Sequence, residues 1–133
     1  MKRLLSISLS LAAVTHAEER MRAGLWEVIT TVDGKPSGTT GGTCYTSAMV
    51  QLANSPAPAL KEATMKSMTA RHCTLNEFKL EGRTISMKSV CGPRSLMTSS
   101  MYGVDSFETN SSATTGGVTT TSRMKGRRLG DCK

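Results

Sequence analysis

Short stretches of alternating apolar and polar residues run through most of this chain, and they constrain its fold more than any other feature. A period of two is the pattern of half-buried β-strands. Asp33-Gly34, the strongest hairpin dipeptide in the chain, and further glycine-containing breaks separate the stretches. We predict seven strands, near residues 24–32, 38–45, 73–80, 84–91, 95–102, 105–113 and 117–125. The fold class is therefore mainly β, an antiparallel meander forming a small sandwich or half-open barrel.

One segment, at about residues 46–68, departs from this alternation. Thr46 or Ser47 is placed to cap a short helix, Pro56 and Pro58 interrupt it, and a further helical turn or two follows. The sequence therefore predicts one short helical excursion in an otherwise β domain.

The N-terminus has the three parts of a signal peptide. Two basic residues at positions 2 and 3 precede the apolar run 4–14, and a small-x-small cleavage site ends at Ala17. Eleven helical residues span only about 16 Å, roughly half of a bilayer core, which is too short for a membrane anchor. We predict a signal peptide over residues 1–17, a single domain over residues 18–133, and a periplasmic protein that is not integral to the membrane.

The charge of the exported chain is moderately basic. Cleavage removes Lys2 and Arg3 but no acidic residue, which leaves 15 basic and 10 acidic side chains, a net charge of about +5. This charge favours anionic surfaces through long-range steering. Nucleic acid is a poor candidate partner, because export separates the two and because the five aromatic residues are not interleaved with the charges.

Cysteine usage agrees with export. An even number of cysteines in an exported chain of this size predicts two disulfides. The chain has no CxxC pair, and its spacings argue against a zinc site or a thioredoxin-like redox pair. The four residues are Cys44, Cys73, Cys91 and Cys132.

The expected strand register favours one pairing of these cysteines but does not establish it. Cys73 and Cys91 lie symmetrically about Gly82, which suggests a bridge across that hairpin. The same register would place Phe78 opposite Ser86, whereas a shift of one residue matches Phe78 with Ile85 or Met87. The preferred pairing is therefore Cys44 with Cys73 and Cys91 with Cys132.

A stripe of cations near the C-terminus is the candidate binding site. Arg123, Lys125 and Arg127 alternate, so they would project from one face of the last strand, with Arg128 on the other. The stripe would suit an anionic glycan, a lipid headgroup or an acidic protein, although a solvated sheet face has the same pattern. Trp26, the only tryptophan, is the expected core anchor.

Catalytic signatures are weak. The only imidazole after the signal segment is His72, beside a cysteine expected to be oxidised, and no nucleophile elbow or phosphate-binding glycine loop is present. Carboxylates that could serve a glycoside hydrolase are scattered over expected strands and turns: Glu27, Glu77, Glu81, Asp105 and Glu108.

Methionine pairs offer a second kind of chemistry. Thioethers bind Cu(I), but they must converge to do so. Methionine is also a gap-filling core residue, which is the simpler interpretation of these pairs. They are Met65 with Met68, and Met97 with Met101.

Five pieces of the chain, taken in order, form a recognisable pattern: Met21-Arg22-Ala23-Gly24-Leu25-Trp26-Glu27-Val28, Cys44-Tyr45-Thr46, Cys73, Cys91 and Gly126-Arg127-Arg128-Leu129-Gly130-Asp131-Cys132. Together they resemble the DUF3617 family of exported Gram-negative bacterial proteins of unknown function. The resemblance covers essentially the whole exported chain and implies a periplasmic domain with paired cysteines, with no characterised activity.

Taken together, these features predict a non-enzymatic periplasmic binding or interaction module that needs no cofactor. Its partner would be an anionic envelope component (an envelope protein, a glycan or a lipid headgroup) or a small apolar ligand held in a small barrel. The alternatives are a methionine-based copper-handling protein and an envelope-polymer hydrolase.

Overall fold

A computed structural model of the chain describes residues 19–133. The predicted signal peptide, residues 1–17, and the cleavage site after Ala17 lie outside the described residues. Among residues 19–133, none of the helices has both the length and the apolar character needed to cross a membrane.

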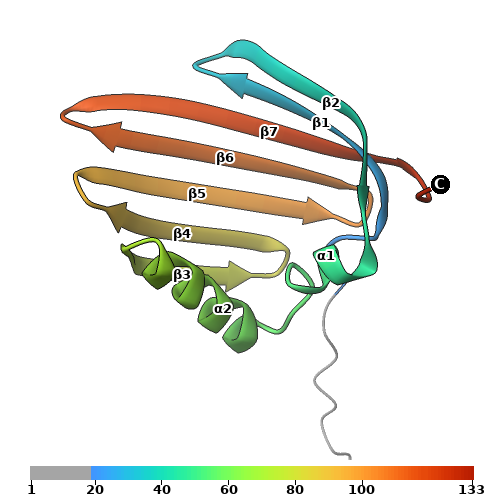
Figure 1. Cartoon of the computed structure of the whole chain (residues 1–133), viewed down its shortest axis with the longest axis horizontal. Coiled ribbons are helices and arrows are strands. Elements are labelled where there is room, and N and C mark those ends of the chain that lie inside the picture. The colour runs from blue at the N-terminus through green and yellow to red at the C-terminus, as the bar shows by residue number, and fades with distance from the viewer. Residues whose placement is uncertain (1–18) are drawn as a thin grey trace, which may run out of the picture.

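The described chain forms one antiparallel sheet of seven strands with two helices (Figure 1). The order of strands across the sheet is β2-β1-β7-β6-β5-β4-β3. The prediction of a mainly β, antiparallel fold is confirmed. Of the predicted arrangements, the structure has the open one, because a single sheet contains all seven strands. The elements are β1 (Gly24–Val32), β2 (Lys35–Tyr45), α1 (Ser47–Gln51), α2 (Ala57–Ala70), β3 (Cys73–Glu81), β4 (Thr84–Cys91), β5 (Arg94–Gly103), β6 (Ser106–Thr115) and β7 (Val118–Gly130).

Each predicted strand is present, and six of the seven have both ends within three residues of the prediction. The hairpin between β1 and β2 turns at Asp33 and Gly34, whose φ angles of 48° and 78° are those of a type I′ turn. Strand β7 ends at Gly130, five residues later than predicted. Its extra length pairs with β1, a partner that lies about 100 residues away in the chain.

The topology explains the helical segment. Strands β2 and β3 are consecutive in sequence but lie at opposite edges of the sheet, so their connection has to cross from one edge to the other. In Figure 1 this connection runs over one side of the sheet, with α2 in front of β3. Thr46 caps α1, accepting a hydrogen bond from the backbone N–H of Met49, and α2 begins directly after Pro56. We call the side of the sheet that carries the helices the helix face.

The core is small and lies at one end of the helix face. Trp26 is fully buried and packs with Met21 and with Val50 of α1. The rings of Phe107 and Tyr45 lie around it, with centroids 5.7 and 6.2 Å from the indole. An aromatic side chain with this many neighbours fixes the position of α1 on the sheet.

The N-terminal segment is tied to this core by side chains from two other elements. The Oδ1 atom of Asn54 accepts hydrogen bonds from the backbone N–H groups of Arg20 and Met21, at 2.7 and 2.8 Å. Its Nδ2 atom donates to the carbonyl of Met21. The Arg83 guanidinium donates to the carbonyls of Glu19 and Arg20, so hydrogen bonds from both sides hold this segment.

Strands β1 and β7 meet in a junction that depends on two glycines. Trp26 pairs with Arg128 and Val28 with Gly126. A Cβ atom on Gly24 would lie 2.5 Å from Nε of Arg128, whose guanidinium donates to the carbonyl of Ala23. A Cβ atom on Gly126 would overlap the ring of Phe107. The two pieces that carry most of the family resemblance are therefore paired with each other, and each supplies space for a side chain of the fold.

Both predicted disulfides are present, but the preferred pairing is wrong. Sulfur atoms join Cys44 to Cys132, called here the long-range disulfide, and Cys73 to Cys91, called the hairpin disulfide. The long-range disulfide ties β2 to the end of the β7 segment.

A β-bulge between Leu75 and Glu77 is the reason for this error. Cys73 lies opposite Cys91 on one side of the bulge, while on the other side Phe78 lies opposite Met87. The bulge inserts one residue in β3, so the symmetric cysteine register and the shifted register of Phe78 exist in the same hairpin. A single uninterrupted register allows only one of them.

Candidate binding surface

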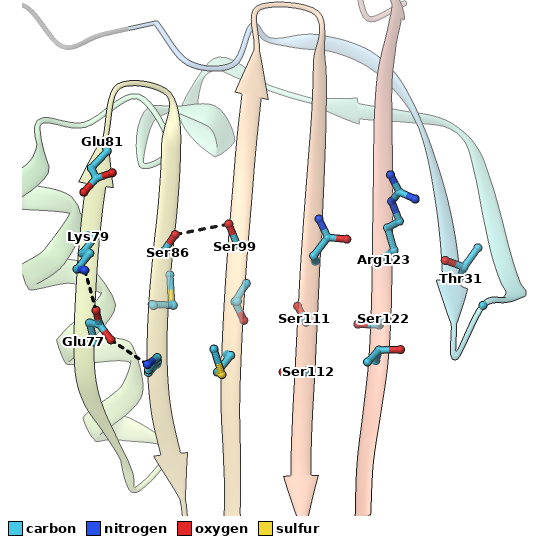
Figure 2. Close-up of a pocket in the computed structure, with 17 residues that line it drawn as sticks. Thr31, Glu77, Lys79, Glu81, Ser86, Ser99, Ser111, Ser112, Ser122 and Arg123 are labelled. Atoms are coloured by element: carbon cyan, nitrogen blue, oxygen red, sulfur yellow. Dashed lines mark hydrogen bonds and ion pairs between the residues drawn. The ribbon is translucent and has the colours of Figure 1, made fainter.

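Most charged side chains of the strands lie on the side of the sheet opposite the helices, which we call the polar face. Its carboxylates belong to Glu27, Glu77, Glu81 and Glu108, and its cations to Lys79, Lys88, Arg123, Lys125 and Arg127. Within residues 19–133 both helices lie behind the sheet in this view, so the polar face is open to solvent (Figure 2).

A shallow depression of about 920 Å³ occupies the middle of the polar face. Besides the apolar side chain of Met97, its centre is lined by hydroxyl and amide side chains from four neighbouring strands, and the hydroxyls of Ser86 and Ser99 lie 3.5 Å apart across β4 and β5. Such groups both donate and accept hydrogen bonds. They are Ser86, Ser99, Asn110, Ser112 and Thr121.

On one side, β3 and β4 border the depression with three charges. The Glu77 carboxylate lies 3.2 Å from Nζ of Lys79 and 3.3 Å from Nζ of Lys88 (Figure 2). The hydrogen bond from Lys79 lowers the pKa of Glu77 below its ordinary value, and the hydrogen bond from Lys88 makes a second, smaller contribution. The carboxylate therefore stays ionised and holds both ammonium groups.

The opposite side is bordered by Arg123 of β7 and Glu108 of β6. The Arg123 Nε atom donates a 2.7 Å hydrogen bond to Oε1 of Glu108. This hydrogen bond lowers the pKa of Glu108. Since the acids and bases of the polar face nearly balance and most of them are paired, its net charge is close to neutral.

The structure separates the predicted cationic stripe into paired and unpaired members. Arg123 and Arg127 are on the polar face, bound to Glu108 and to Glu27. Lys125 lies between them, and among the described residues it has no ion pair within 4 Å. The side chain of Arg128 is on the helix face, where it donates to the carbonyl of Ala23 at 2.9 Å.

The position of β7 decides where the cationic stripe lies in the sheet. At an edge of the sheet, such cations would discourage strand addition. Strand β7 pairs with β1 on one side and β6 on the other, so it is an interior strand. The edges are β2, which contains Pro36 and several glycines, and β3.

The catalytic candidates do not gather at one place: Glu77 and Glu81 line the depression, Glu27 and Glu108 line a second concavity, and Asp105 pairs with Arg22. His72 is exposed, with a φ of 58°, and is followed directly by a disulfide cysteine. Glu77 and Glu108 have lowered pKa values, whereas a general acid needs a raised one. Within residues 19–133, no group of three or more His, Cys, Asp or Glu side chains is placed to hold a metal ion.

The methionine pairs do not converge either. Met97 and Met101 share the polar face of β5, four residues apart, a separation of about 13 Å along a strand. Met65 and Met68 belong to α2, on the other side of the sheet. A Cu(I) site built from both pairs is therefore not formed.

Two features were missed in the sequence. The hydroxyl-lined centre of the polar face consists of Ser, Thr and Asn, which are too common in this chain to draw attention. Their alternate positions in four predicted strands were a usable signal, because hairpin turns set the register that aligns them. The second is a cluster of aromatic side chains on the helix face, which arises from pairing between strands distant in sequence.

Comparison with known proteins gives one match. The model of a family described as a protein of unknown function, DUF3617, matches residues 21–132. Neither a curated protein nor a solved structure matches the chain.

Proposed function

The chain belongs to the DUF3617 family, a family of unknown function, and from that premise we propose that it is a non-enzymatic periplasmic binding module whose polar face binds an envelope glycan. The observation that carries the proposal is the open depression of about 920 Å³ with a hydroxyl and amide centre. A glycan presents many hydroxyl groups, and these match a surface that both donates and accepts hydrogen bonds.

The charges of the polar face favour a glycan over a polyanion or an anionic membrane. Binding of a polyanion requires cations that are free to meet it, but Arg123 and Arg127 already pair with Glu108 and Glu27. The remaining cation of the stripe, Lys125, would give only weak steering at physiological salt. Uncharged hydrogen-bonding groups then supply most of the specificity.

The low pKa values of Glu77 and Glu108 support binding without catalysis. An ionised carboxylate in a fixed ion pair presents hydrogen-bond acceptors at constant geometry over the neutral pH range. It does not donate the proton that cleavage of a glycosidic bond needs.

Two disulfides support work outside the cytoplasm, because such bonds persist in oxidising compartments. The N-terminal segment with the pattern of a signal peptide supports export to the periplasm in particular.

The test is co-sedimentation of the purified mature chain with insoluble peptidoglycan, and in parallel with vesicles of anionic phospholipid. We expect retention by peptidoglycan that changes less than twofold between 50 and 300 mM salt. The variant Ser99→Ala/Asn110→Ala should bind at least fivefold more weakly. Thr69→Ala, which removes an exposed hydroxyl on α2, is the matched control and should bind like the wild type.

Two results would contradict the proposal. One is the absence of retention by peptidoglycan. The other is binding to the vesicles alone with steep loss at high salt, which would point to a lipid headgroup and to Lys125 in place of the hydroxyl-lined centre.

A further inference from the structure

A second concavity opens on the helix face, between α1 and the sheet. It has a volume of about 260 Å³ and is called here the aromatic cleft. The chain has five aromatic residues, and four of them are in or beside the cleft: Tyr45, Tyr102 and Phe107 line it and Trp26 lies against them. Four of the five aromatic side chains therefore surround one concavity, and apolar, aromatic walls of this kind are typical of small-molecule sites.

Its walls come from distant parts of the chain. Phe107 forms the floor, and its ring centroid is 5.7 Å from that of Trp26 and 6.3 Å from that of Tyr102. Met49 of α1 is at the mouth, with 57% of its surface exposed. A large apolar side chain left this exposed beside a pocket can move to cover an occupant, because methionine adapts its shape at low cost.

A short series of hydroxyl groups provides polarity at one side of the cleft. The hydroxyls of Ser100 and Thr109 lie 2.9 Å apart, and Thr109 lines the cleft. Tyr102 lies beside them, and burial raises the pKa of its phenol despite a hydrogen bond with Ser100. The hydroxyls are thus uncharged donors and acceptors in an otherwise apolar surround.

The lining contains no charged side chain: it consists of Met21, Tyr45, Met49, Val50, Tyr102, Phe107 and Thr109. A charged ligand group would lose its hydration here, and the nearby Arg20 guanidinium, which acts on Tyr102, already donates to the carbonyls of Ala53 and Ser55. For scale, an apolar cavity of roughly 150 Å³ holds one benzene molecule. The aromatic cleft thus has room for about ten non-hydrogen atoms.

We infer that the aromatic cleft is a binding site for a small neutral molecule made of one aromatic ring, or an acyl chain of similar size, with a single hydroxyl or carbonyl group directed at Thr109. This site is independent of the proposed glycan surface, because the two lie on opposite faces of the sheet. Loss of either function would leave the other intact.

The test uses 4-propylphenol as the neutral probe and 4-propylbenzoate as its charged counterpart, with the intact mature protein. Trp26 is the only tryptophan and packs against two residues of the lining, so its fluorescence reports occupancy. We expect saturable binding of 4-propylphenol with a Kd on the order of 100 μM, as suits about ten atoms. The benzoate should bind at least tenfold more weakly.

Variants locate the site. Met49→Ala should weaken binding of 4-propylphenol by about threefold to tenfold, while Met65→Ala, at a similarly exposed methionine of α2 outside the cleft, should leave it unchanged. Thr109→Val keeps the shape of the side chain, so it should weaken binding of 4-propylphenol about fivefold and leave that of propylbenzene unchanged.

The inference fails if the wild type gives no saturable signal up to 2 mM probe, if the benzoate binds as well as the phenol, or if Met49→Ala and Met65→Ala have equal effects. Thermal unfolding of each variant, measured in parallel, shows that the compared proteins are folded.

Discussion

Gly126 is buried in the middle of β7, and its replacement by alanine tests the junction between the first and last strands. A Cβ atom at this position would overlap Cε1 of Phe107 and lie 2.5 Å from Cδ1 and Cζ of the same ring. The ring packs against Trp26 and Tyr102, so it can shift towards the aromatic cleft only by giving up part of these contacts. Overpacking of this kind costs about 1–3 kcal/mol.

The backbone of Gly126 is not in the left-handed region, so the change introduces no backbone strain. Alanine also lowers the conformational entropy of the unfolded chain relative to glycine, which by itself stabilises the fold by about 0.4–1 kcal/mol. Taking the middle of each range, the net loss in Gly126→Ala is then about 1.3 kcal/mol, and for a domain of this length the Tm falls by roughly 5 °C.

Thermal unfolding followed by circular dichroism measures the effect. The matched control is Gly38→Ala in β2, where an added Cβ atom would meet no atom within 4 Å and the φ angle is ordinary. That variant should unfold within 3 °C of the wild type or slightly above it. Adding Phe107→Leu to Gly126→Ala should recover about 1 kcal/mol relative to the sum of the single changes, because the smaller side chain vacates the contested space.

The reasoning about the junction is refuted if Gly126→Ala is as stable as Gly38→Ala. It is also refuted if the two changes at positions 107 and 126 are additive, since additivity would mean that the two residues do not compete for the same space.

Three further predictions concern other parts of the fold. Replacing both cysteines of the long-range disulfide with serine should cost about 4.6 kcal/mol in the chain-entropy model and replacing those of the hairpin disulfide about 3.2 kcal/mol, because they close loops of 88 and 18 residues; urea unfolding that ranked them in reverse would contradict this. The pKa of Glu77 is lowered in the folded state, so its ion pairs stabilise the fold at pH values above the pKa of the unfolded state, and this stabilisation is lost as the pH falls through the pKa of the folded state. NMR titration of Lys79→Gln should show the pKa of Glu77 rising towards its ordinary value. An unchanged pKa would exclude the ion pair. Asn54→Ala should cost about 2–4 kcal/mol, because it removes three hydrogen bonds to the N-terminal segment, whereas the exposed Asn76→Ala should change stability by less than 1 kcal/mol; equal effects of the two would show that Asn54 does not hold that segment.

The strands were predictable because their signals are local. Alternation and glycine turns located all seven, and Asp33-Gly34 marked the hairpin whose turn angles are those of type I′. The end of β7 was not predictable in this way, since residues 126–130 contain two glycines and two adjacent arginines. They form a strand because β1 supplies hydrogen-bonding partners, an interaction that no local pattern shows.

The disulfide pairing failed for a related reason. Nothing in the residues around Asn76 marks a bulge, and a single inserted residue reverses the conclusion that register supports. The wrong partner for Cys44 has a second and larger cause, which is that the sequence does not give the order of the strands in the sheet. Only that order shows that Cys44, in an edge strand, lies beside the C-terminus.

The same distinction between local patterns and long-range pairing applies to the candidate surfaces. Alternation alone places Arg123, Lys125 and Arg127 on one face, but their partners Glu108 and Glu27 follow from pairing between strands. The aromatic cleft combines residues separated by more than 60 positions, so its existence depends wholly on the fold.

The most direct test of the central claim, that the polar face is the binding surface, uses the side-chain amide resonances of ¹⁵N-labelled protein during titration with soluble peptidoglycan fragments. Asn110 lies in the hydroxyl-lined centre, and Asn54 is on the helix side, holding the N-terminal segment. The account predicts saturable shifts of the Asn110 amide with those of Asn54 unchanged. Shifts of Asn54 alone, or of neither side chain, would contradict it.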